Sequence, residues 1–98
     1  MYKGYVEKDD LKALFEAILS LETTEECKAF FDDLCTIAEI KSMAQRWLVV
    51  EMLDKNATYA DVVEKTAASS ATISRVKRCL HYGADGYKNT LLKLKKKK

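Results

Sequence analysis

Small hydroxyl side chains and cations lie together between Thr58 and Leu80, and such side chains suit contacts with nucleic acid. At about 100° per residue, a helix here would place Ile73, Val76 and Leu80 on one side. The other side would carry short polar and cationic side chains, which can bond bases or phosphates in a major groove. These residues are Ala71, Ser74, Arg75 and Arg78 on the outward side, Thr72 and Lys77 on its flanks, and Ser69 and Ser70 where the helix starts.

A shorter helix is expected just before this one, because Thr58 stands three residues ahead of Asp61, the spacing of a capping box. A serine in the turn between the two helices would cap the second. The segment from residue 58 to about residue 80 therefore predicts a helix-turn-helix, in which Tyr59 would touch a DNA phosphate. An ordinary surface hairpin of two helices with a solvated charged face would show the same pattern.

The composition favours an all-α protein. The 98 residues include no proline and three glycines, so helix interiors are almost free of residues that break helices. Hydrophobic residues make up 48% of the chain and charged residues 33%, which is typical of a globular protein. The length suits a single domain over residues 1–98.

The net charge of +2 is unevenly distributed along the chain. Residues 1–35 carry a net charge of −5 and residues 36–66 a net charge of −1, whereas residues 67–98 carry +8. A basic segment that begins with the expected DNA-reading helix is typical of proteins that contact nucleic acid. Half of the +8 comes from the last four lysines of the basic tail (residues 93–98), which could instead be a solvated chain end.

Several classes of protein are not expected. The cysteines Cys27, Cys35 and Cys79 lack paired spacing, and the first two lie on apolar stripes where core residues are expected. Cys79 and His81 lack the further ligands of a zinc site, and no catalytic pair or phosphate loop is apparent, so neither an enzyme nor a bound metal is expected. No signal peptide or membrane span is apparent either, which predicts a cytoplasmic protein.

Two amphipathic helices are expected in the acidic first third of the chain. Asp9 or Asp10 would cap the first, whose apolar stripe covers residues 11–19. The second would begin at Thr23, which stands three residues before Glu26 in another capping box.

A longer helix is expected from Thr36, which heads a third capping box, to about Lys55. Four consecutive apolar residues from Trp47 cover most of its circumference, so this helix must be buried on more than one side. In so short a chain, part of that burial would come from a second subunit, which predicts a dimer; the alternative is an unusually central helix. A last short helix over residues 87–94, after a C-cap at Gly83, brings the total to about six helices.

The motifs LCTIAEIKSMAQRW, VVEML and ATISR, within residues 34–80, resemble the Trp repressor family. The run SATISRVKRCLHYGADGY resembles the YerC/YecD branch of that family. This resemblance implies an interlocked homodimer that presents one helix-turn-helix per subunit to successive major grooves of double-stranded DNA, about 34–36 Å apart. It also implies a sequence-specific transcriptional regulator of a two-fold-symmetric operator, and it favours a repressor.

The resemblance further implies an effector site. Trp repressor holds L-tryptophan between two arginines, which match Arg46 and Arg75 here, and Thr36 matches a threonine near that pocket. The match is incomplete, because Val76 stands where Trp repressor has glycine and Cys79 replaces a serine, and pocket volume governs such binding. The alternative is that Arg46 forms an ion pair and Arg75 contacts only DNA.

The turn also departs from the family pattern. Ala67 stands where family members often have glycine, in a turn that commonly requires a positive φ. Alanine in that conformation would cost about 1 kcal/mol.

Two other functions stay open on the sequence alone. The basic end could dock an acidic protein partner, with DNA affinity as an incidental property. An RNA-binding protein would instead need exposed aromatic side chains for base stacking, and near the basic end these are limited to Tyr59, Tyr82 and Tyr87.

Overall fold

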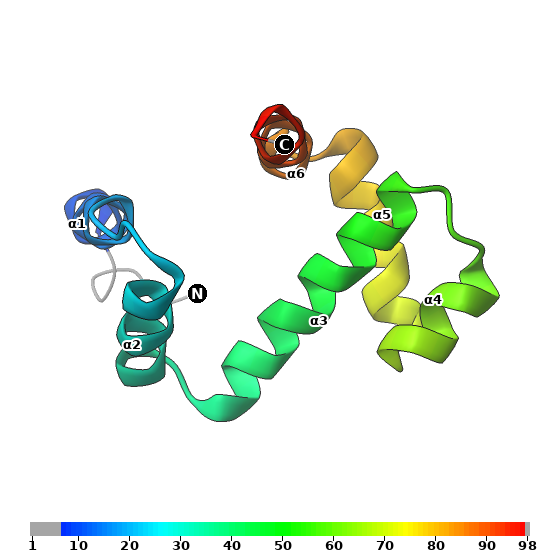
Figure 1. Cartoon of the computed structure of the whole chain (residues 1–98), viewed down its shortest axis with the longest axis horizontal. Coiled ribbons are helices and arrows are strands. Elements are labelled where there is room, and N and C mark those ends of the chain that lie inside the picture. Colours follow the sequence, from blue (N-terminus) through cyan, green and yellow to red (C-terminus); the bar gives the residue numbers. More distant parts are fainter. Residues whose placement is uncertain (1–6, 98) are drawn as a thin grey trace. The chain divides into compact units, whose positions relative to one another are not determined.

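The computed structural model describes residues 7–97, which form six α-helices and no strand (Figure 1). The prediction of an all-α fold with about six helices is therefore confirmed. The expected basic tail is helical up to Lys96, and its last residue, Lys98, lies outside the described residues. The helices are α1 (Lys8–Leu19), α2 (Thr24–Leu34), α3 (Ile37–Asp54), α4 (Tyr59–Thr66), α5 (Ser70–Tyr82) and α6 (Gly86–Lys96).

The chain divides into two compact units, of which the first ends at Ile40 and the second begins at Lys41. The first unit contains α1, α2 and the first turn of α3. The second unit contains the rest of α3 and the three following helices.

Polar side chains fix the helix starts of the first unit, with two changes from the prediction. Asp10 does not cap α1 itself; its Oδ2 accepts a hydrogen bond from the N–H of Glu7, the residue that precedes the helix (3.2 Å). Thr23 caps α2 as predicted, because its Oγ1 accepts from the N–H of Glu26 (3.0 Å). The Glu26 carboxylate accepts from the N–H of Glu22 (2.8 Å), one residue before the partner that a capping box predicts.

The third capping box forms in full at the start of α3. The Thr36 N–H donates to the Glu39 carboxylate (2.8 Å), and the Glu39 N–H donates to Thr36 Oγ1 (3.1 Å). Two backbone donors are thereby satisfied reciprocally where α3 begins, as the spacing predicts.

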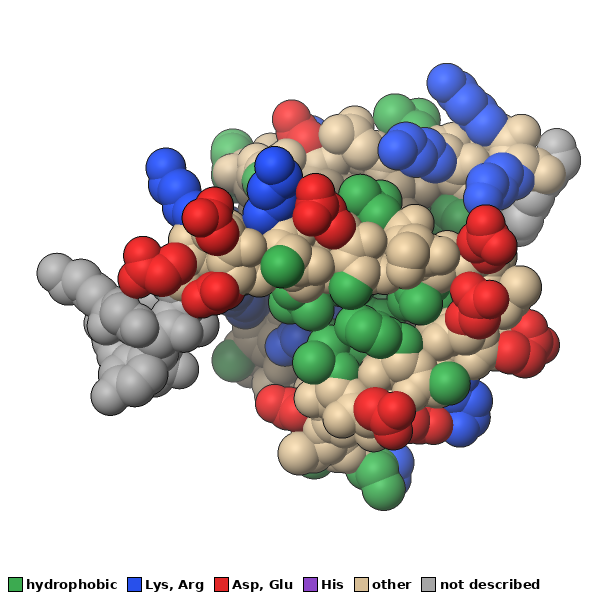
Figure 2. Space-filling model, turned by 90° about the vertical axis from the view of Figure 1, so that its left-hand side faces the viewer, with side chains coloured by type: hydrophobic (Ala, Val, Ile, Leu, Met, Phe, Trp, Pro, Cys, Tyr) green, Lys and Arg blue, Asp and Glu red, His purple; other side chains and the backbone are tan. Residues whose placement is uncertain are grey.

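The first unit has no buried residue in α1 or α2. Leu11, Phe15 and Leu19, which share one face of α1, are 42%, 56% and 81% exposed. Figure 2, which is seen from the side of α1 and α2 in Figure 1, shows hydrophobic side chains (green) at the surface among acidic ones (red). Cys27 is exposed and Cys35 is half-buried, so the expectation of two core cysteines is wrong for Cys27 in the single chain.

The second unit has a hydrophobic core of its own, to which each of its four helices and the turn between α4 and α5 contribute. The completely buried side chains Val49 and Val50 show that the carboxyl half of α3 is central to the core of the second unit. On a neighbouring side of the same helix, Leu48 stays 40% exposed. The buried residues are Val49, Val50, Val62, Ala68, Ile73, Val76 and Leu91.

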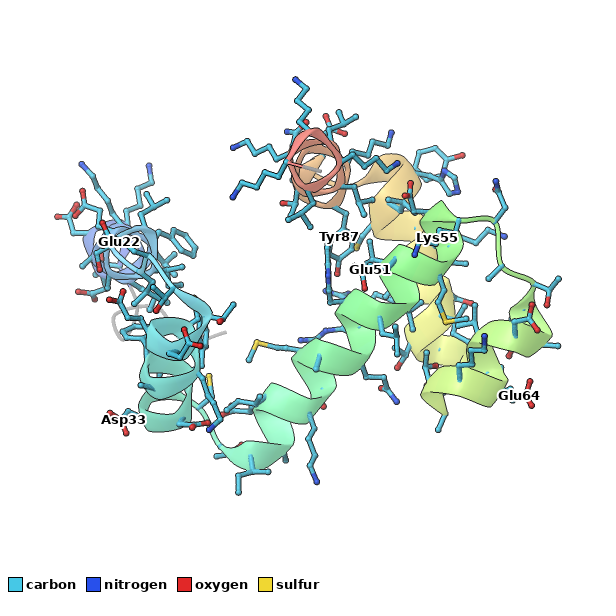
Figure 3. All side chains as sticks on the ribbon, viewed as in Figure 1. Glu22, Asp33, Glu51, Lys55, Glu64 and Tyr87 are labelled. Carbon is cyan, nitrogen blue, oxygen red and sulfur yellow. The ribbon has the colours of Figure 1, made fainter. Side chains whose placement is uncertain are left out.

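Helix α6 is held against α3 near both of its ends. The ring of Tyr87 points toward α3 (Figure 3), and its centroid lies 6.2 Å from that of Trp47. The Lys95 ammonium lies 2.9 Å from the Asp54 carboxylate. Gly83 ends α5 as predicted, and a Cβ there would collide with the Cys79 carbonyl oxygen that accepts from the Gly83 N–H.

Candidate nucleic-acid interface

Helices α4 and α5, joined by a short turn, form the helix-turn-helix that the sequence predicts. Thr58 caps α4 by accepting from the N–H of Asp61 (3.1 Å). Ser69 caps α5 by accepting from the N–H of Thr72 (3.1 Å). Helix α5 continues to Tyr82, two residues beyond the expected end of the motif.

The turn between α4 and α5 has a left-handed backbone at Ala67, although alanine stands there in place of the glycine that is common in the family. Ala67 has φ 58° and ψ 19°, a conformation in which a Cβ is unfavourable by about 1 kcal/mol. The next residue, Ala68, is buried, and its N–H donates to Thr66 Oγ1 (3.0 Å). The Thr66 hydroxyl in turn donates to the Val62 carbonyl oxygen (2.7 Å), so the turn is tied back onto α4.

A side chain that the sequence did not reveal supports the same turn. The Gln45 amide on α3 donates to the Thr66 carbonyl oxygen (2.9 Å) across 21 residues of sequence, in a half-buried position. This oxygen belongs to the last turn of α4, where helix carbonyls lose their intrahelical partners. Gln45 therefore fixes the end of α4 relative to α3.

Helix α5 turns its apolar side inward and its cationic side outward. Ile73 and Val76 are 4% and 1% exposed, which fixes the rotation of the helix about its axis. Two of the predicted contact residues are restricted: Thr72 is half-buried, and the Ser69 hydroxyl, which caps the helix, also donates to the Thr72 hydroxyl (3.1 Å). The remaining predicted DNA-contact residues are all exposed, namely Tyr59, Ser70, Ala71, Ser74, Arg75, Lys77 and Arg78.

The outward face of α5 is electropositive over its whole length. Residues 67–84 contain no acidic residue, so no carboxylate of the turn or of α5 offsets the charges of Arg75, Lys77 and Arg78. The helix N-terminus, at Ser70, adds the positive end of the helix dipole. Glu64, on α4, points outward from the two helices (Figure 3). The arrangement suits a polyanion in front of α5.

The predicted effector residues belong to two helices, α3 and α5. Thr36 caps α3, Arg46 lies half-buried within α3, and Arg75 is exposed on α5. Val76, the residue that departs from the family pattern, points into the core instead of to the surface. Neither arginine lines the hollow of about 540 Å³ in the second unit; its lining residues are Trp47, Cys79, Gly83, Ala84, Gly86, Tyr87 and Thr90.

Two further properties concern the described residues 7–97. No helix among them is long and apolar enough to cross a membrane. They also contain no group of three or more His, Cys, Asp or Glu side chains placed to hold a metal ion.

The fold and the exposed cationic helix define an all-α helix-turn-helix protein. The chain matches the family model of the Trp repressor protein over residues 9–95. It belongs to the Trp repressor family, and the resemblance seen in the sequence is confirmed. Proteins of this family are non-enzymatic regulators, which places the chain outside the enzymes.

Individual relatives agree with this placement. The uncharacterized protein YerC of Bacillus subtilis (strain 168) is 56% identical over 86 residues, which cover 88% of this chain and 83% of that protein. The crystal structure of a candidate Trp repressor from Staphylococcus aureus matches with a TM-score of 0.87 and 48% identity, over 91% of this chain and 89% of that one. A TrpR-like protein from Eubacterium eligens ATCC 27750 matches with a TM-score of 0.86 and 48% identity, over 94% and 95% of the two chains.

Proposed function

We propose that this protein is a cytoplasmic homodimeric regulator of transcription, a repressor, that binds a two-fold-symmetric operator in double-stranded DNA. The observation that carries the proposal is the exposed, acid-free face of α5, presented by a helix-turn-helix in a member of the Trp repressor family. Ser70, Ala71 and Ser74 are short enough to let the helix approach base edges, while Arg75 and Arg78 pair with guanine or phosphate. Tyr59, at the start of α4, lies where it can bond the backbone beside the groove.

The dimer is supported by the apolar side chains that the single chain leaves uncovered. Leu11, Phe15 and Leu19 form a stripe on α1, and Leu48 on α3 is also exposed. A stripe of this kind is unfavourable in water unless another surface covers it. A second copy of the chain would supply that surface and would also place two α5 helices on one duplex, which two-fold operator symmetry requires.

Effector control is a separate part of the proposal. Arg46, Arg75 and Thr36 are the residues we assign to an effector site, with L-tryptophan as the first ligand to test. Val76 is 1% exposed and packs in the core, so its side chain does not occupy the outer surface beside Arg75. Two arginines can bracket the planar ring of such a ligand and pair with its carboxylate.

The proposal is tested by selecting bound duplexes from a random-sequence pool and measuring their affinity by fluorescence anisotropy. A two-fold-symmetric sequence should be enriched, and its affinity should fall steeply with salt, by about 0.9 logarithmic units per logarithmic unit of salt for each phosphate contacted. Each measurement is repeated with L-tryptophan, which should tighten binding if the effector assignment is right. Equal, weak binding to every duplex would contradict the proposal and favour a module that docks an acidic protein.

A further inference from the structure

An exposed surface on α5 extends from the expected DNA-contact residues to the carboxyl end of the helix. Five side chains on the outward side line a shallow hollow of about 650 Å³, and we call this surface the distal face of α5. At about 100° per residue they lie on one side of the helix, with Arg78 and Tyr82 opposite the buried Ile73 and Val76 and with Lys77 at the flank. The five are Ser74, Lys77, Arg78, His81 and Tyr82.

The length of α5 separates this face from the base-reading end. Its 13 residues span about 20 Å at about 1.5 Å per residue, whereas a major groove is about 12 Å wide and about 8.5 Å deep. In a helix-turn-helix the amino-terminal residues of the second helix contact the base edges. Tyr82 would then lie about 18 Å along the axis from Ser70, a distance greater than the depth of the groove, and so outside the groove.

The chemistry of the distal face matches a sugar-phosphate backbone. Lys77 and Arg78 supply positive charge, and no acidic residue lines the hollow. Tyr82 is 86% exposed, so its ring can pack on a deoxyribose while its hydroxyl donates to a phosphate oxygen. His81, between these residues in the sequence, adds an N–H donor.

A second hollow, which shares His81 with the distal face, differs in charge. That hollow, of about 380 Å³, is lined by apolar side chains that include Leu53 and Leu91, and by Asp54, whose carboxylate lies 2.9 Å from the Lys95 ammonium. The Asp54 carboxylate offsets one of the two lysines that line this hollow, whereas no carboxylate lines the distal face to offset Lys77 and Arg78. The two sides of the end of α5 are therefore unequal, and the cationic side is the one that suits DNA.

We infer that Lys77, Arg78, His81 and Tyr82 bind the DNA backbone that flanks the base pairs read by the amino-terminal half of α5. The inference rests on the proposed function. It assigns His81 and Tyr82 to the interface and divides α5 into a base-reading half and a backbone-binding half. The distal face then sets how much flanking duplex the protein needs, but not which sequence it prefers.

The test compares wild-type protein with the Lys77→Gln/Tyr82→Ala variant on two duplexes. One duplex carries the selected site with long flanks, and the other ends flush with the site. Lys88→Gln, which changes the hollow that contains Asp54, is the matched control. We expect the wild type and the control to lose about tenfold in affinity on the flush duplex. The variant should bind the long duplex about tenfold more weakly than the wild type does. Its affinity should be the same for the flush duplex as for the long one.

Sequence preference gives a second readout. Competition between the selected site and single-base variants of it should give the same ratios for the wild type and the variant, because phosphate contacts carry no direct sequence information. An equal loss on trimming for all three proteins, or an altered sequence preference, would overturn the inference while leaving the proposed function intact. If the wild type selects no duplex at all, the proposed function fails, and the inference fails with it.

Discussion

The two units of the chain bury their apolar residues in opposite ways. The second unit, from Lys41 onward, encloses a core around Val49, Val50 and Val62, each completely buried. The first unit, which ends at Ile40, has well-capped helices but no buried residue in α1 or α2. Helix capping and hydrophobic burial therefore stabilise this protein separately. The second unit, which contains the helix-turn-helix, has capped helices and a buried core, whereas the acidic first unit has mainly the capped helices.

This difference indicates how the parts contribute to function. The core of the second unit fixes the rotation of α5 and hence which side chains face outward. The first unit presents a stripe that we propose is covered by a second copy of the chain, so its order would depend on association. Substitutions in the second unit should then change the stability of the fold, whereas substitutions in the first unit should change the oligomeric state.

The largest effect is expected from charging the stripe on α1. Phe15→Glu with Leu19→Glu places four carboxylates in the proposed dimer interface, and losing the burial of four large side chains costs about 6 kcal/mol or more. Sedimentation should show the wild type at twice the chain mass of 11.1 kDa and the variant at the chain mass. Ala13→Glu, on the opposite side of α1, is the control and should leave the dimer intact. A wild type that sediments as a monomer would contradict the proposed role of the first unit.

The core of the second unit should respond next most strongly. Ile73→Ala removes a side chain that is 4% exposed, and such truncations lower the free energy of unfolding by about 2–5 kcal/mol. Urea unfolding measures the change. Ser74→Ala, on the exposed side of the same helix, should change the free energy of unfolding by about 0.5 kcal/mol or less. Similar losses in the free energy of unfolding for the two variants would mean that Ile73 does not face the core and that α5 is rotated about its axis.

A smaller effect is expected at the contact that supports the turn. Gln45→Met keeps the length of the side chain but leaves the Thr66 carbonyl oxygen without its donor, at a cost of about 1–2 kcal/mol. Urea unfolding again reports the loss, with Lys41→Met as a surface control on the same helix. An unchanged free energy of unfolding would show that water replaces the amide without loss.

The smallest effect should be a gain in stability. Ala67→Gly relieves the left-handed conformation at φ 58°, and after the added flexibility of the unfolded chain is subtracted, a stabilisation of up to about 0.5 kcal/mol should remain. Ala60→Gly, inside α4, is the matched change in a right-handed helix and should destabilise by about 0.5–1 kcal/mol. Thermal unfolding should shift the two midpoints in opposite directions, and a shift in the same direction would contradict the role of φ at Ala67.

Local sequence signals predict most of this fold because capping and helical periodicity act over three or four residues. Thr23, Thr36 and Thr58 each start a helix as predicted, and the stripe of Ile73 and Val76 gives the correct inward face of α5. The sequence also shows that Ala67 stands where family members often have glycine. The turn requires a positive φ at this position whatever residue occupies it.

Other features depend on tertiary contacts that leave no local pattern. The bond from Gln45 to Thr66 joins residues 21 positions apart, and a single glutamine on a helix gives no sign of its partner. Cys27 lies on an apolar stripe, but whether that stripe is covered within one chain depends on the packing of the whole unit. The hydroxyls of Ser69 and Thr72 bond each other, so they are less available for DNA. Short polar side chains suit base contacts, but the sequence does not show that these two are already paired.

The central claim is that the outward face of α5 binds duplex DNA, and one comparison tests it most directly. The affinity of the selected duplex is measured by fluorescence anisotropy for wild type, for Arg75→Ala/Arg78→Ala, and for the control Lys8→Ala/Lys41→Ala, which removes two exposed cations elsewhere. We expect the arginine variant to lose about a hundredfold or more in affinity for the duplex, since each contact contributes about 1–3 kcal/mol. The control should lose much less. Equal affinity for the arginine variant and the wild type, with both folded, would contradict the account.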